Sequence, residues 1–430
     1  MRYGEAPRRP TDLWLFPSLL LLFGLTLHLG GCVVSPSSRL PPLVQPQTAL
    51  EVASPLMRDL LRSETMLAPY LQKAEELRLQ LLLGWVEPGP NPALRQIGFR
   101  ADAEYFYPAS TVKLFAAIAA LEQLNDLATL TQLPIRRDTP LRLHPLFPGE
   151  ELVTADPTHL ATGTVTVEHE IRKLFLVSDN EAFNRLYELV GPDGLARSLE
   201  HAGFTHARIV HRLAEPRTPE ENRMLPQIDF VGTGWEYTLP QRTAAPVPAP
   251  DLETPGLALG KGYFDAQGNL ISEPLNFSTK NRFPLLELQR GLCKLVRPDV
   301  DCGSPGTFRL SEEDRRFLLE IMSQLPTESR DPVYDPTEYP DAWGKFLLPG
   351  LSDIRPSAEW RIVNKIGRAY GFSTENAWIH HWPSGRSAFV AATLYTNSDG
   401  ILNDDRYEYT EIADPFFRAL GRAVGRWLSQ

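Results

Sequence analysis

The feature that most constrains this chain is an apolar run, residues 112–121, which is hydrophobic on nearly every face of a helix. Such a helix has no polar side to present to water, so it belongs inside a domain. Pro108 and Ser110 stand just before the run, and Lys113 is the one charged residue within it. The sequence therefore predicts a buried helix that begins at a hydroxyl group and carries a lysine in its first turn.

Ser110 and Lys113 are three residues apart, a spacing that places two side chains on one face of a helix. Apolar surroundings disfavour the ammonium form of a lysine, so Lys113 could take the proton of a hydroxyl that is otherwise a weak nucleophile. The unpaired backbone N–H of Ser110 could face a developing oxyanion. The alternative is that Ser110 only caps the helix and Lys113 reaches the surface.

Charge and residue spacing exclude several classes of function. The 430 residues carry a net charge of −10, and basic residues cluster only at the extreme N-terminus, which argues against a nucleic-acid partner. Neither Cys293 nor Cys302 has a histidine at ligand spacing, and the histidines at 380 and 381 lack an acidic cluster, so no metal is expected. No other cofactor is expected, since Lys and Ser can carry proton transfers.

The N-terminus has the pattern of an export signal. Arginines precede an apolar run, residues 13–29, that is short for a membrane span and ends in Leu-Gly-Gly-Cys. That tetrapeptide resembles the bacterial lipobox, in which the cysteine becomes the lipidated first residue of the mature protein. We predict a signal peptide with lipobox over residues 1–32 and an exported lipoprotein anchored to a membrane through Cys32, facing the periplasm or the cell exterior. A plain signal peptide is the alternative.

The predicted export also affects how the segments after residue 32 and their two cysteines are interpreted. Residues 33–49 are rich in Pro, Ser and Gln without periodicity and are predicted to be a tether, and residues 50–430 are predicted to form one domain. In an oxidising compartment the spacing of Cys293 and Cys302 permits a local disulfide loop.

Hydrophobic periodicity orders the elements of that domain. Helices are expected over residues 56–71, 112–121, 165–176, 283–295, 311–325 and 415–428, and strands over 77–86, 94–107, 360–365, 377–382 and 387–395. Residues 216–277 are rich in proline and are interpreted as an insertion or lid with a small hairpin at 262–271. The expected fold class is α+β, with one antiparallel sheet built from both chain ends, flanked by helices, and an all-helical lobe, about residues 110–350, inserted between them.

Three motifs with hydroxyl, amide and ammonium groups stand in order along the chain: Ser110-x-x-Lys113, Ser178-Asp179-Asn180 after a helix, and Lys365-Ile366-Gly367 at the end of a strand. This order resembles the penicillin-recognising serine hydrolases, most closely the class A β-lactamase family. The resemblance extends from about residue 56 to the C-terminus and is tightest over residues 165–208. It implies a β-lactamase/transpeptidase-like fold.

Roles can be carried over from that family residue by residue. Ser110 would be the acylated nucleophile and Lys113 its proton partner. Ser178 would relay the proton to the leaving group, and Lys365 would add positive charge near Ser178 and near a substrate carboxylate. Asn180 would hold the amide side chain of the substrate.

The remaining motif residues would act through the backbone. Asp179 would fix its turn by backbone hydrogen bonds. The oxyanion hole would be formed by the backbone N–H groups of Ser110 and of Arg368, just after Gly367. Preorganised donors of this kind typically contribute on the order of 3 kcal/mol to lowering the barrier.

Two positions depart from the family pattern. A loop glutamate that activates the deacylating water would fall near Leu213, counted from Gly203, whereas Glu215 stands two residues later and lacks the family's Leu-Asn pair. Glu215 is the best candidate for this base, and an ordinary loop glutamate is the alternative. Ile366 replaces the usual Thr or Ser, so recognition of a substrate carboxylate would be weakened or shifted to Arg368 or Arg386.

Three functions stay open at this point. The first is a serine hydrolase that forms an acyl-enzyme on Ser110 and hydrolyses β-lactam amides. The second is a D-Ala-type cell-wall peptidase or esterase of the same fold, with a cell-wall peptide or ester as acyl substrate and poor β-lactam turnover. The third is a catalytically weak binding lipoprotein, although pure binding requires none of the motif residues.

Overall fold

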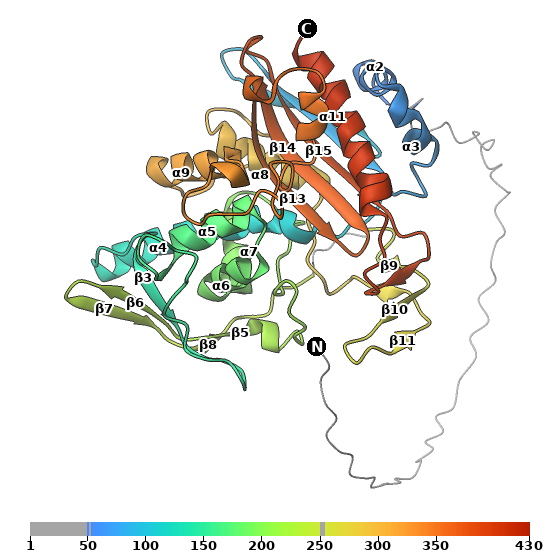
Figure 1. The fold of residues 1–430 in the computed structure, drawn as a ribbon. Coiled ribbons are helices and arrows are strands. Elements are labelled where there is room, and N and C mark those ends of the chain that lie inside the picture. The colour runs from blue at the N-terminus through green and yellow to red at the C-terminus, as the bar shows by residue number, and fades with distance from the viewer. Residues whose placement is uncertain (1–49, 51–52, 250–253) are drawn as a thin grey trace, which may run out of the picture. The chain divides into compact units, whose positions relative to one another are not determined.

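Five antiparallel strands from the two ends of the chain form the central sheet of the computed structural model (Figure 1). The strands are β1 (Gln80–Glu87), β2 (Ala93–Phe99), β13 (Trp360–Ala369), β14 (Phe372–His381) and β15 (Ser387–Tyr395). Their order is β13-β14-β15-β1-β2, so β1 from the N-terminal part lies beside β15 from the C-terminal part. The expected α+β fold, with a sheet built from both chain ends, is confirmed.

The structure describes residue 50 and residues 53–249 and 254–430. The predicted signal peptide with Cys32 and the predicted tether, residues 33–49, lie outside these residues. Within the described ranges, no helix is long and apolar enough to cross a membrane.

Helices cover both faces of the sheet (Figure 1). One face is covered by α11 (Asp414–Leu428) with α2 (Pro55–Arg62), α3 (Ala68–Gln72) and α10 (Leu348–Ser352), and the other by α8 (Leu285–Val296) and α9 (Glu312–Ser323). Side chains alternate between the faces: Leu81 and Leu83 pack in the core beneath α11, and Leu82 packs in the core on the opposite side. The helices expected at both ends of the chain are confirmed.

The predicted buried helix is α4 (Lys113–Thr131), preceded by the 3₁₀ turn η2 (Ala109–Val112). Every residue of α4 from Lys113 to Glu122 is buried, as the apolar composition of this stretch requires. Three helices pack around it: α5 (Val167–Leu176), α6 (Asn180–Val190) and α7 (Pro192–His201).

The inserted lobe is not all helical, which corrects the sequence prediction. It contains a four-stranded sheet in the order β4-β3-β6-β7, made by β3 (Pro140–Leu143), β4 (Val165–Thr166), β6 (Ile228–Gly232) and β7 (Trp235–Leu239). The β6–β7 hairpin lies in the Pro-rich segment, where the stretch between Pro226 and Pro240 is free of proline. Ile228 and Phe230 are fully buried, so this half of the segment belongs to the core of the lobe.

The other half of the Pro-rich segment forms short strands below the main sheet (Figure 1). The expected hairpin is present as β10 (Gly262–Phe264) and β11 (Leu270–Ile271), and β10 also pairs in parallel with β16 (Ile401–Leu402). The other short elements are β5 (Met224–Leu225), β8 (Arg242–Thr243), β9 (Ala258–Leu259), β12 (Leu275–Asn276), η1 (Thr65–Leu67), η3 (Glu221–Arg223), η4 (Pro326–Glu328), η5 (Ser357–Glu359) and η6 (Tyr409–Ala413). A disulfide joins Cys293, in the last turn of α8, to Cys302 in the loop that follows the helix.

Candidate active site

Ser110 lies in the tight turn η2, where the main sheet meets the helical lobe. Ala109, just before it, has a positive φ of 46°, a conformation that costs a non-glycine residue about 1–3 kcal/mol and that clusters at functional sites. Thr111 holds the turn, because its hydroxyl donates to the Pro108 carbonyl over 2.6 Å. Ser110 itself is half-buried. The fold therefore maintains backbone strain at the point where it presents this hydroxyl.

Lys113 is fully buried one turn further along. Its Nζ donates to the Ser178 carbonyl oxygen over 2.6 Å and to Asn180 Oδ1 over 2.7 Å, and lies 3.4 Å from Ser178 Oγ. Burial and the nearby ammonium of Lys365 hold the pKa of Lys113 well below its usual range. The environment thus disfavours the ammonium form relative to an exposed lysine, and the hydrogen bonds of Nζ go to the 178–180 turn rather than to Ser110.

The turn between α5 and α6 carries the second motif. Ser178 has a positive φ of 61°, and Asp179 caps α6 by accepting the Ala182 N–H over 2.9 Å. Asp179 thus fixes the turn through a backbone hydrogen bond, as expected. Asn180 is exposed, with its Oδ1 turned to Lys113.

The third motif lies on β13, the edge strand of the sheet. Lys365 Nζ donates to Ser178 Oγ over 2.8 Å and to the Ile366 carbonyl over 3.0 Å. Burial lowers the pKa of Lys365 to about 7, opposed by the nearby carboxylate of Glu375. Two lysines of lowered pKa therefore face one hydroxyl group, that of Ser178.

Gly367 lets β13 approach η2, the turn that carries Ser110, closely. A Cβ at this position would lie 2.6 Å from the Pro108 carbonyl oxygen and 2.9 Å from the backbone nitrogen of Ser110. Contacts that short are not sustained by real Cβ atoms, so this residue must be glycine. The backbone of β13 at Gly367 is consequently close to the backbone nitrogen of Ser110, one of the two donors expected to form an oxyanion hole.

Strand alternation decides which residues of β13 face the site. Lys365 and Gly367 face the helical lobe, while Ile366 packs with α11 in the opposite core and is 7% exposed. The Arg368 guanidinium lies on the α11 face as well, paired with Asp414. The side chain of Arg368 is therefore not available to a substrate carboxylate at the site.

Arg386, the other arginine considered for that role, stacks over the Trp427 ring at the opposite end of β14 and β15. Lys365 is thus the cation that β13 presents on the site face. The hydroxyl that the family carries beside this lysine has no counterpart here, because Ile366 is used for packing.

A cluster of buried charged and amide side chains packs against β13, and it was not predicted from the sequence. Lys345 Nζ donates to Asn364 Oδ1 over 2.9 Å, and Asn364 Nδ2 donates to Glu375 Oε1 over 2.7 Å. Burial raises the pKa of Glu375 to about 7 and lowers that of Lys345 to about 8. Little in the sequence signalled the cluster, because Glu375 stands among the polar residues Ser373, Thr374 and Asn376 of β14.

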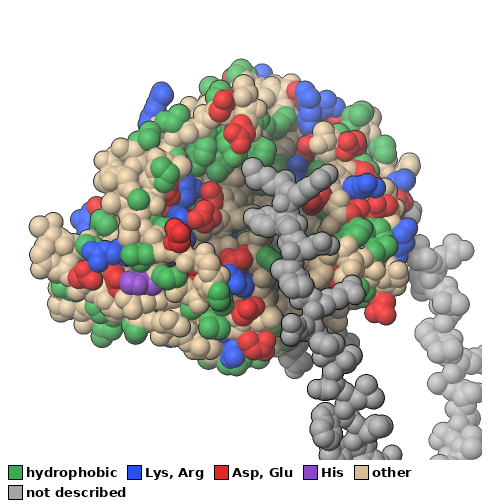
Figure 2. All heavy atoms as spheres, turned by 60° about the horizontal axis from the view of Figure 1, so that its bottom comes forward, with side chains coloured by type: hydrophobic (Ala, Val, Ile, Leu, Met, Phe, Trp, Pro, Cys, Tyr) green, Lys and Arg blue, Asp and Glu red, His purple; other side chains and the backbone are tan. Residues whose placement is uncertain are grey.

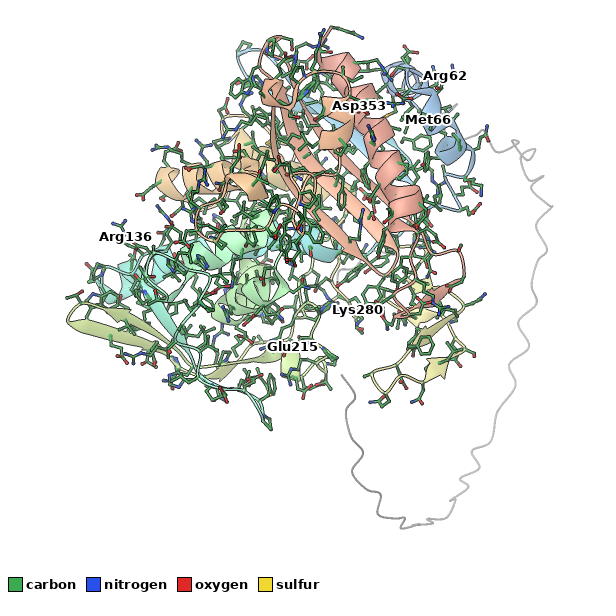
Figure 3. The ribbon with its side chains drawn as sticks, viewed as in Figure 1. Arg62, Met66, Arg136, Glu215, Lys280 and Asp353 are labelled. Atoms are coloured by element: carbon green, nitrogen blue, oxygen red, sulfur yellow. A yellow bond between two sulfur atoms is a disulfide. The ribbon has the colours of Figure 1, made fainter. Side chains whose placement is uncertain are left out.

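In the loop that contains Leu213 and Glu215, the backbone of Leu213 forms two hydrogen bonds with α6. The Asn184 amide donates to the Leu213 carbonyl over 3.1 Å and accepts the Leu213 N–H over 2.9 Å. The Glu215 carboxylate accepts from Asn184 Nδ2 over 3.2 Å and pairs with Arg217 Nε over 2.6 Å. Figure 3 shows Glu215 among the loops near β5, below α6.

Glu215 and Asn180 nevertheless line the same cavity of about 400 Å³. Charged side chains in its wall are largely paired, since Glu188 accepts from Arg212 and Glu150 from Arg217. The face that carries this loop is hollowed near its middle and mixes acidic and basic side chains (Figure 2). Glu215 is therefore near the site but engaged by its own ion pair. Behind it, Glu221 caps its own turn by accepting the Thr218 N–H.

The ion pair leads to a prediction for Glu215→Gln. Because Arg217 holds the carboxylate, we expect hydrolysis of a β-lactam by this variant to stay within about threefold of wild type, far from the 10²- to 10⁴-fold loss typical of a missing general base. The measurement is the steady-state hydrolysis rate, with the exposed Glu273→Gln as the matched control. A loss of about a hundredfold would instead identify Glu215 as the deacylating base.

A strained serine turn beside buried lysines lies at the junction of this sheet and the inserted lobe, in a fold of the β-lactamase/transpeptidase class. Residues 95–232, which include Ser110, Lys113 and the 178–180 turn, match the model of the β-lactamase enzyme family. This match covers less than half of the 430 residues, so it establishes a likeness to that family over this part of the chain.

Solved structures similar to this chain include several β-lactamases. That from Desulfarculus baarsii is 18% identical, with 85% of this chain and 97% of that chain covered and a TM-score of 0.44. A class A β-lactamase from Mycobacterium abscessus is 17% identical, with 84% and 98% covered and a TM-score of 0.45. One from Xanthomonas campestris is 19% identical, with 85% and 97% covered and a TM-score of 0.44. No curated protein matches the sequence.

Proposed function

We propose that this protein is a β-lactam-hydrolysing enzyme that forms an acyl-enzyme on Ser110. The observation that carries the proposal is the pair of buried lysines, Lys113 and Lys365, on either side of the Ser178 hydroxyl. Burying two ammonium groups is costly unless their pKa values fall, and lowered pKa values are what acid–base catalysis at neutral pH needs.

The steps follow from these contacts. Ser110 Oγ attacks the lactam carbonyl carbon, and its proton passes to the neutral amine of Lys113. The oxyanion accepts hydrogen bonds from the backbone N–H groups of Ser110 and Arg368. When the lactam C–N bond breaks, Ser178 gives its proton to the leaving nitrogen and regains one from the lysines, while Lys365 offsets the developing negative charge. Water then hydrolyses the ester.

The same geometry supports a second candidate, a D-Ala-type cell-wall peptidase or esterase. The apolar Leu213 holds the loop position where a deacylating glutamate is expected, and the Glu215 carboxylate is paired with Arg217. Both observations favour an acyl-enzyme that forms readily but is hydrolysed slowly. A catalytically weak binding protein is the least favoured, because binding alone gives no reason to bury Lys113 and Lys365.

The test is mass spectrometry of the full chain after incubation with a penicillin and, separately, a cephalosporin, with hydrolysis followed in parallel. We expect a bound acyl mass on the peptide that contains Ser110, or turnover that is lost in Ser110→Ala and kept in Ser323→Ala at the end of α9. A long-lived adduct without turnover would favour the peptidase or esterase. Absence of both adduct and turnover would refute the β-lactam assignment.

We further propose that the enzyme is exported as a lipoprotein, anchored through Cys32 and acting outside the cytoplasm. The support is the lipobox-like sequence at residues 29–32 and a disulfide that joins Cys293 to Cys302, which suits an oxidising compartment. Cell fractionation should find the chain with membranes, and Cys32→Ser should release it. Equal membrane recovery of both forms would argue against the lipid anchor.

A further inference from the structure

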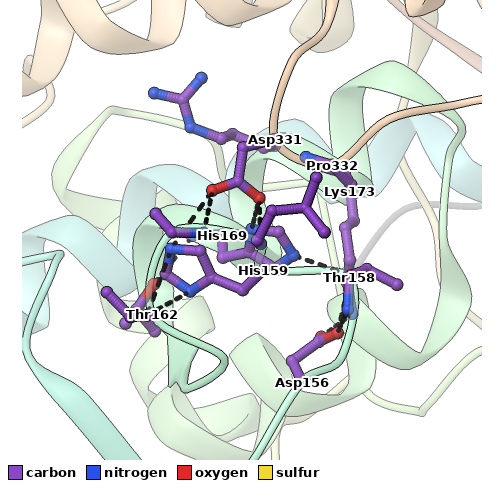
Figure 4. Close-up of polar contacts among 12 residues, drawn as sticks. Asp156, Thr158, His159, Thr162, His169, Lys173, Asp331 and Pro332 are labelled. Carbon is purple, nitrogen blue, oxygen red and sulfur yellow. Dashed lines mark hydrogen bonds and ion pairs between the residues drawn. The ribbon is translucent and has the colours of Figure 1, made fainter.

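Three side chains from separate segments of the inserted lobe converge in a second cluster (Figure 4). His159 precedes β4, His169 lies in α5, and Asp331 follows η4. Their ligand atoms all lie within 4.8 Å of one another. His159 Nε2 is 3.7 Å from Asp331 Oδ2, and His169 Nδ1 is 3.7 Å from Asp331 Oδ1.

The hydrogen bonds of the His159 and His169 rings indicate which nitrogen of each ring carries the proton. His159 Nδ1 lies 2.8 Å from the Thr164 carbonyl, which can only accept, so Nδ1 carries the proton. The Thr158 hydroxyl donates its one proton to Asp156 over 2.6 Å, so it accepts from His169 Nε2 over 2.8 Å. In the neutral rings the other nitrogen carries a lone pair: His169 Nδ1 lies near the Asp331 carboxylate, and His159 Nε2 lies between that carboxylate and the Thr162 hydroxyl, which is 3.5 Å away.

The carboxylate is itself oriented by the backbone. Its oxygens accept the N–H groups of Leu160 over 2.9 Å and Ala161 over 3.1 Å, which leaves further lone pairs on both oxygens. Two imidazole lone pairs and a carboxylate thus converge. Their negative ends repel one another, and a cation bound between them would offset this repulsion.

We propose that His159 Nε2, His169 Nδ1 and the Asp331 carboxylate bind a zinc ion. Tetrahedral Zn²⁺ with bonds of about 2.1 Å places its ligand atoms roughly 3.4 Å apart, close to the 3.7 Å separations found here. The Thr164 carbonyl and the Thr158 hydroxyl orient the rings as outer partners of zinc-bound histidines do. Asp331 is 27% exposed, which leaves an open side for entry and for a water ligand.

The chemistry of the donors favours zinc over the common hard cations. Imidazole nitrogens suit Zn²⁺, whereas Mg²⁺ and Ca²⁺ prefer oxygen ligands. A bound ion would join the loop at 159, the helix α5 and the loop at 331. Because α5 leads directly into the Ser178 turn, the ion would have a structural role beside the reaction site.

This inference departs from the sequence expectation of no metal, which rested on local spacing. His159 and His169 are separated by β4, and Asp331 follows only after the whole Pro-rich segment and two further helices. No short motif therefore signals the cluster, and only the packing of α5 against the following segments brings the ligands together.

The experiment is equilibrium dialysis of the full chain, stripped with a chelator and exposed to Zn²⁺ or to Mg²⁺ alone, followed by metal analysis. We expect about one bound zinc per chain and no bound magnesium. Cobalt(II) should give visible absorption bands of a low-coordinate site. A wild-type chain that binds no zinc, or as much magnesium as zinc, would overturn the proposal.

Variants separate this cluster from incidental zinc binding. His159→Gln and Asp331→Asn should each abolish the bound equivalent, and Thr158→Val, which keeps all three ligands, should weaken affinity by about 10- to 100-fold. His206→Gln is the matched control, because His206 also lies beside a carboxylate, 2.9 Å from Glu287, outside the cluster. Zinc should raise the Tm of wild type and of His206→Gln but not that of His159→Gln or Asp331→Asn. Unchanged zinc binding in Asp331→Asn and Thr158→Val would refute the site.

Discussion

Replacing Lys113 by methionine is expected to slow acylation of Ser110 by a β-lactam by about 10²- to 10⁴-fold, the usual contribution of a general base. Methionine keeps the bulk of the side chain in the buried site but cannot accept the serine proton. It also leaves the Ser178 carbonyl and Asn180 Oδ1 without the ammonium or amine donor that now lies 2.6 and 2.7 Å away. The measurement is the single-turnover acylation rate constant.

The pH dependence of acylation adds a second readout for the same variant. A base works when deprotonated, so the rate should fall as pH decreases through the lowered pKa of Lys113. Lys365 works as the ammonium form, so the rate should also fall as pH rises through its pKa of about 7. The wild-type profile is thus expected to be bell-shaped, with apparent pKa values that belong to the coupled pair. Lys113→Met should lose the low-pH limb.

A matched control is available in another buried lysine. Lys294 Nζ donates to the carbonyls of Ser304 and Gly306 over 2.8 and 2.7 Å, away from the site. Lys294→Met removes a similar set of hydrogen bonds and should leave the acylation rate and its pH profile unchanged. If Lys113→Met acylates at the wild-type rate, Lys113 is not the proton acceptor for Ser110.

Replacing Gly367 by alanine is expected to slow acylation and to lower the stability of the fold. The new Cβ would meet the Pro108 carbonyl oxygen at 2.6 Å and the Ser110 nitrogen at 2.9 Å, and these backbone atoms cannot rotate away. The strand β13 must then move from η2, the turn that carries Ser110, which separates the two oxyanion donors. Loss of one such donor typically costs 10²- to 10³-fold in rate, and overpacking typically costs about 1–3 kcal/mol of stability.

The measurements for Gly367→Ala are the acylation rate constant and the Tm. Gly89→Ala is the control, since a Cβ at Gly89 would meet no heavy atom within 4 Å. It should leave the acylation rate unchanged. Wild-type acylation by Gly367→Ala, at any Tm, would show that the close approach of β13 is not needed for the reaction.

Local patterns were sufficient for most of the secondary structure and for the residues brought together at the site. The buried helix α4, the hairpin β1–β2 and the final strands follow from periodicity, because residues three or four apart share a helix face and residues two apart share a strand face. The three motifs meet in space because Ser110 directly precedes α4, Ser178 lies in the turn between α5 and α6, and β13, which continues past Lys365 to Ala369, passes beside both turns. The β6–β7 hairpin was missed because prolines on both sides hide a short proline-free stretch.

Contacts between residues that are far apart in the sequence could not be predicted from local patterns. The side of β13 on which Ile366 and Arg368 lie depends on the orientation of the strand between two cores, and that orientation is decided by packing against α11. Whether Glu215 is free or paired depends on where Arg217 and Asn184 come to rest. Distances of this kind are properties of the assembled core, in which contacts span hundreds of residues.

The amino-acid sequence by itself determined the order of helices and strands, the buried lysine near Ser110, and the need for glycine at 367 as part of a motif. The tertiary structure alone decided the ion pair of Glu215, the buried cluster around Glu375, and the meeting of His159 and His169 with Asp331. The physical reason is that hydrophobic periodicity acts over a few residues, whereas hydrogen bonds and ion pairs form only between atoms that packing has already placed about 3 Å apart.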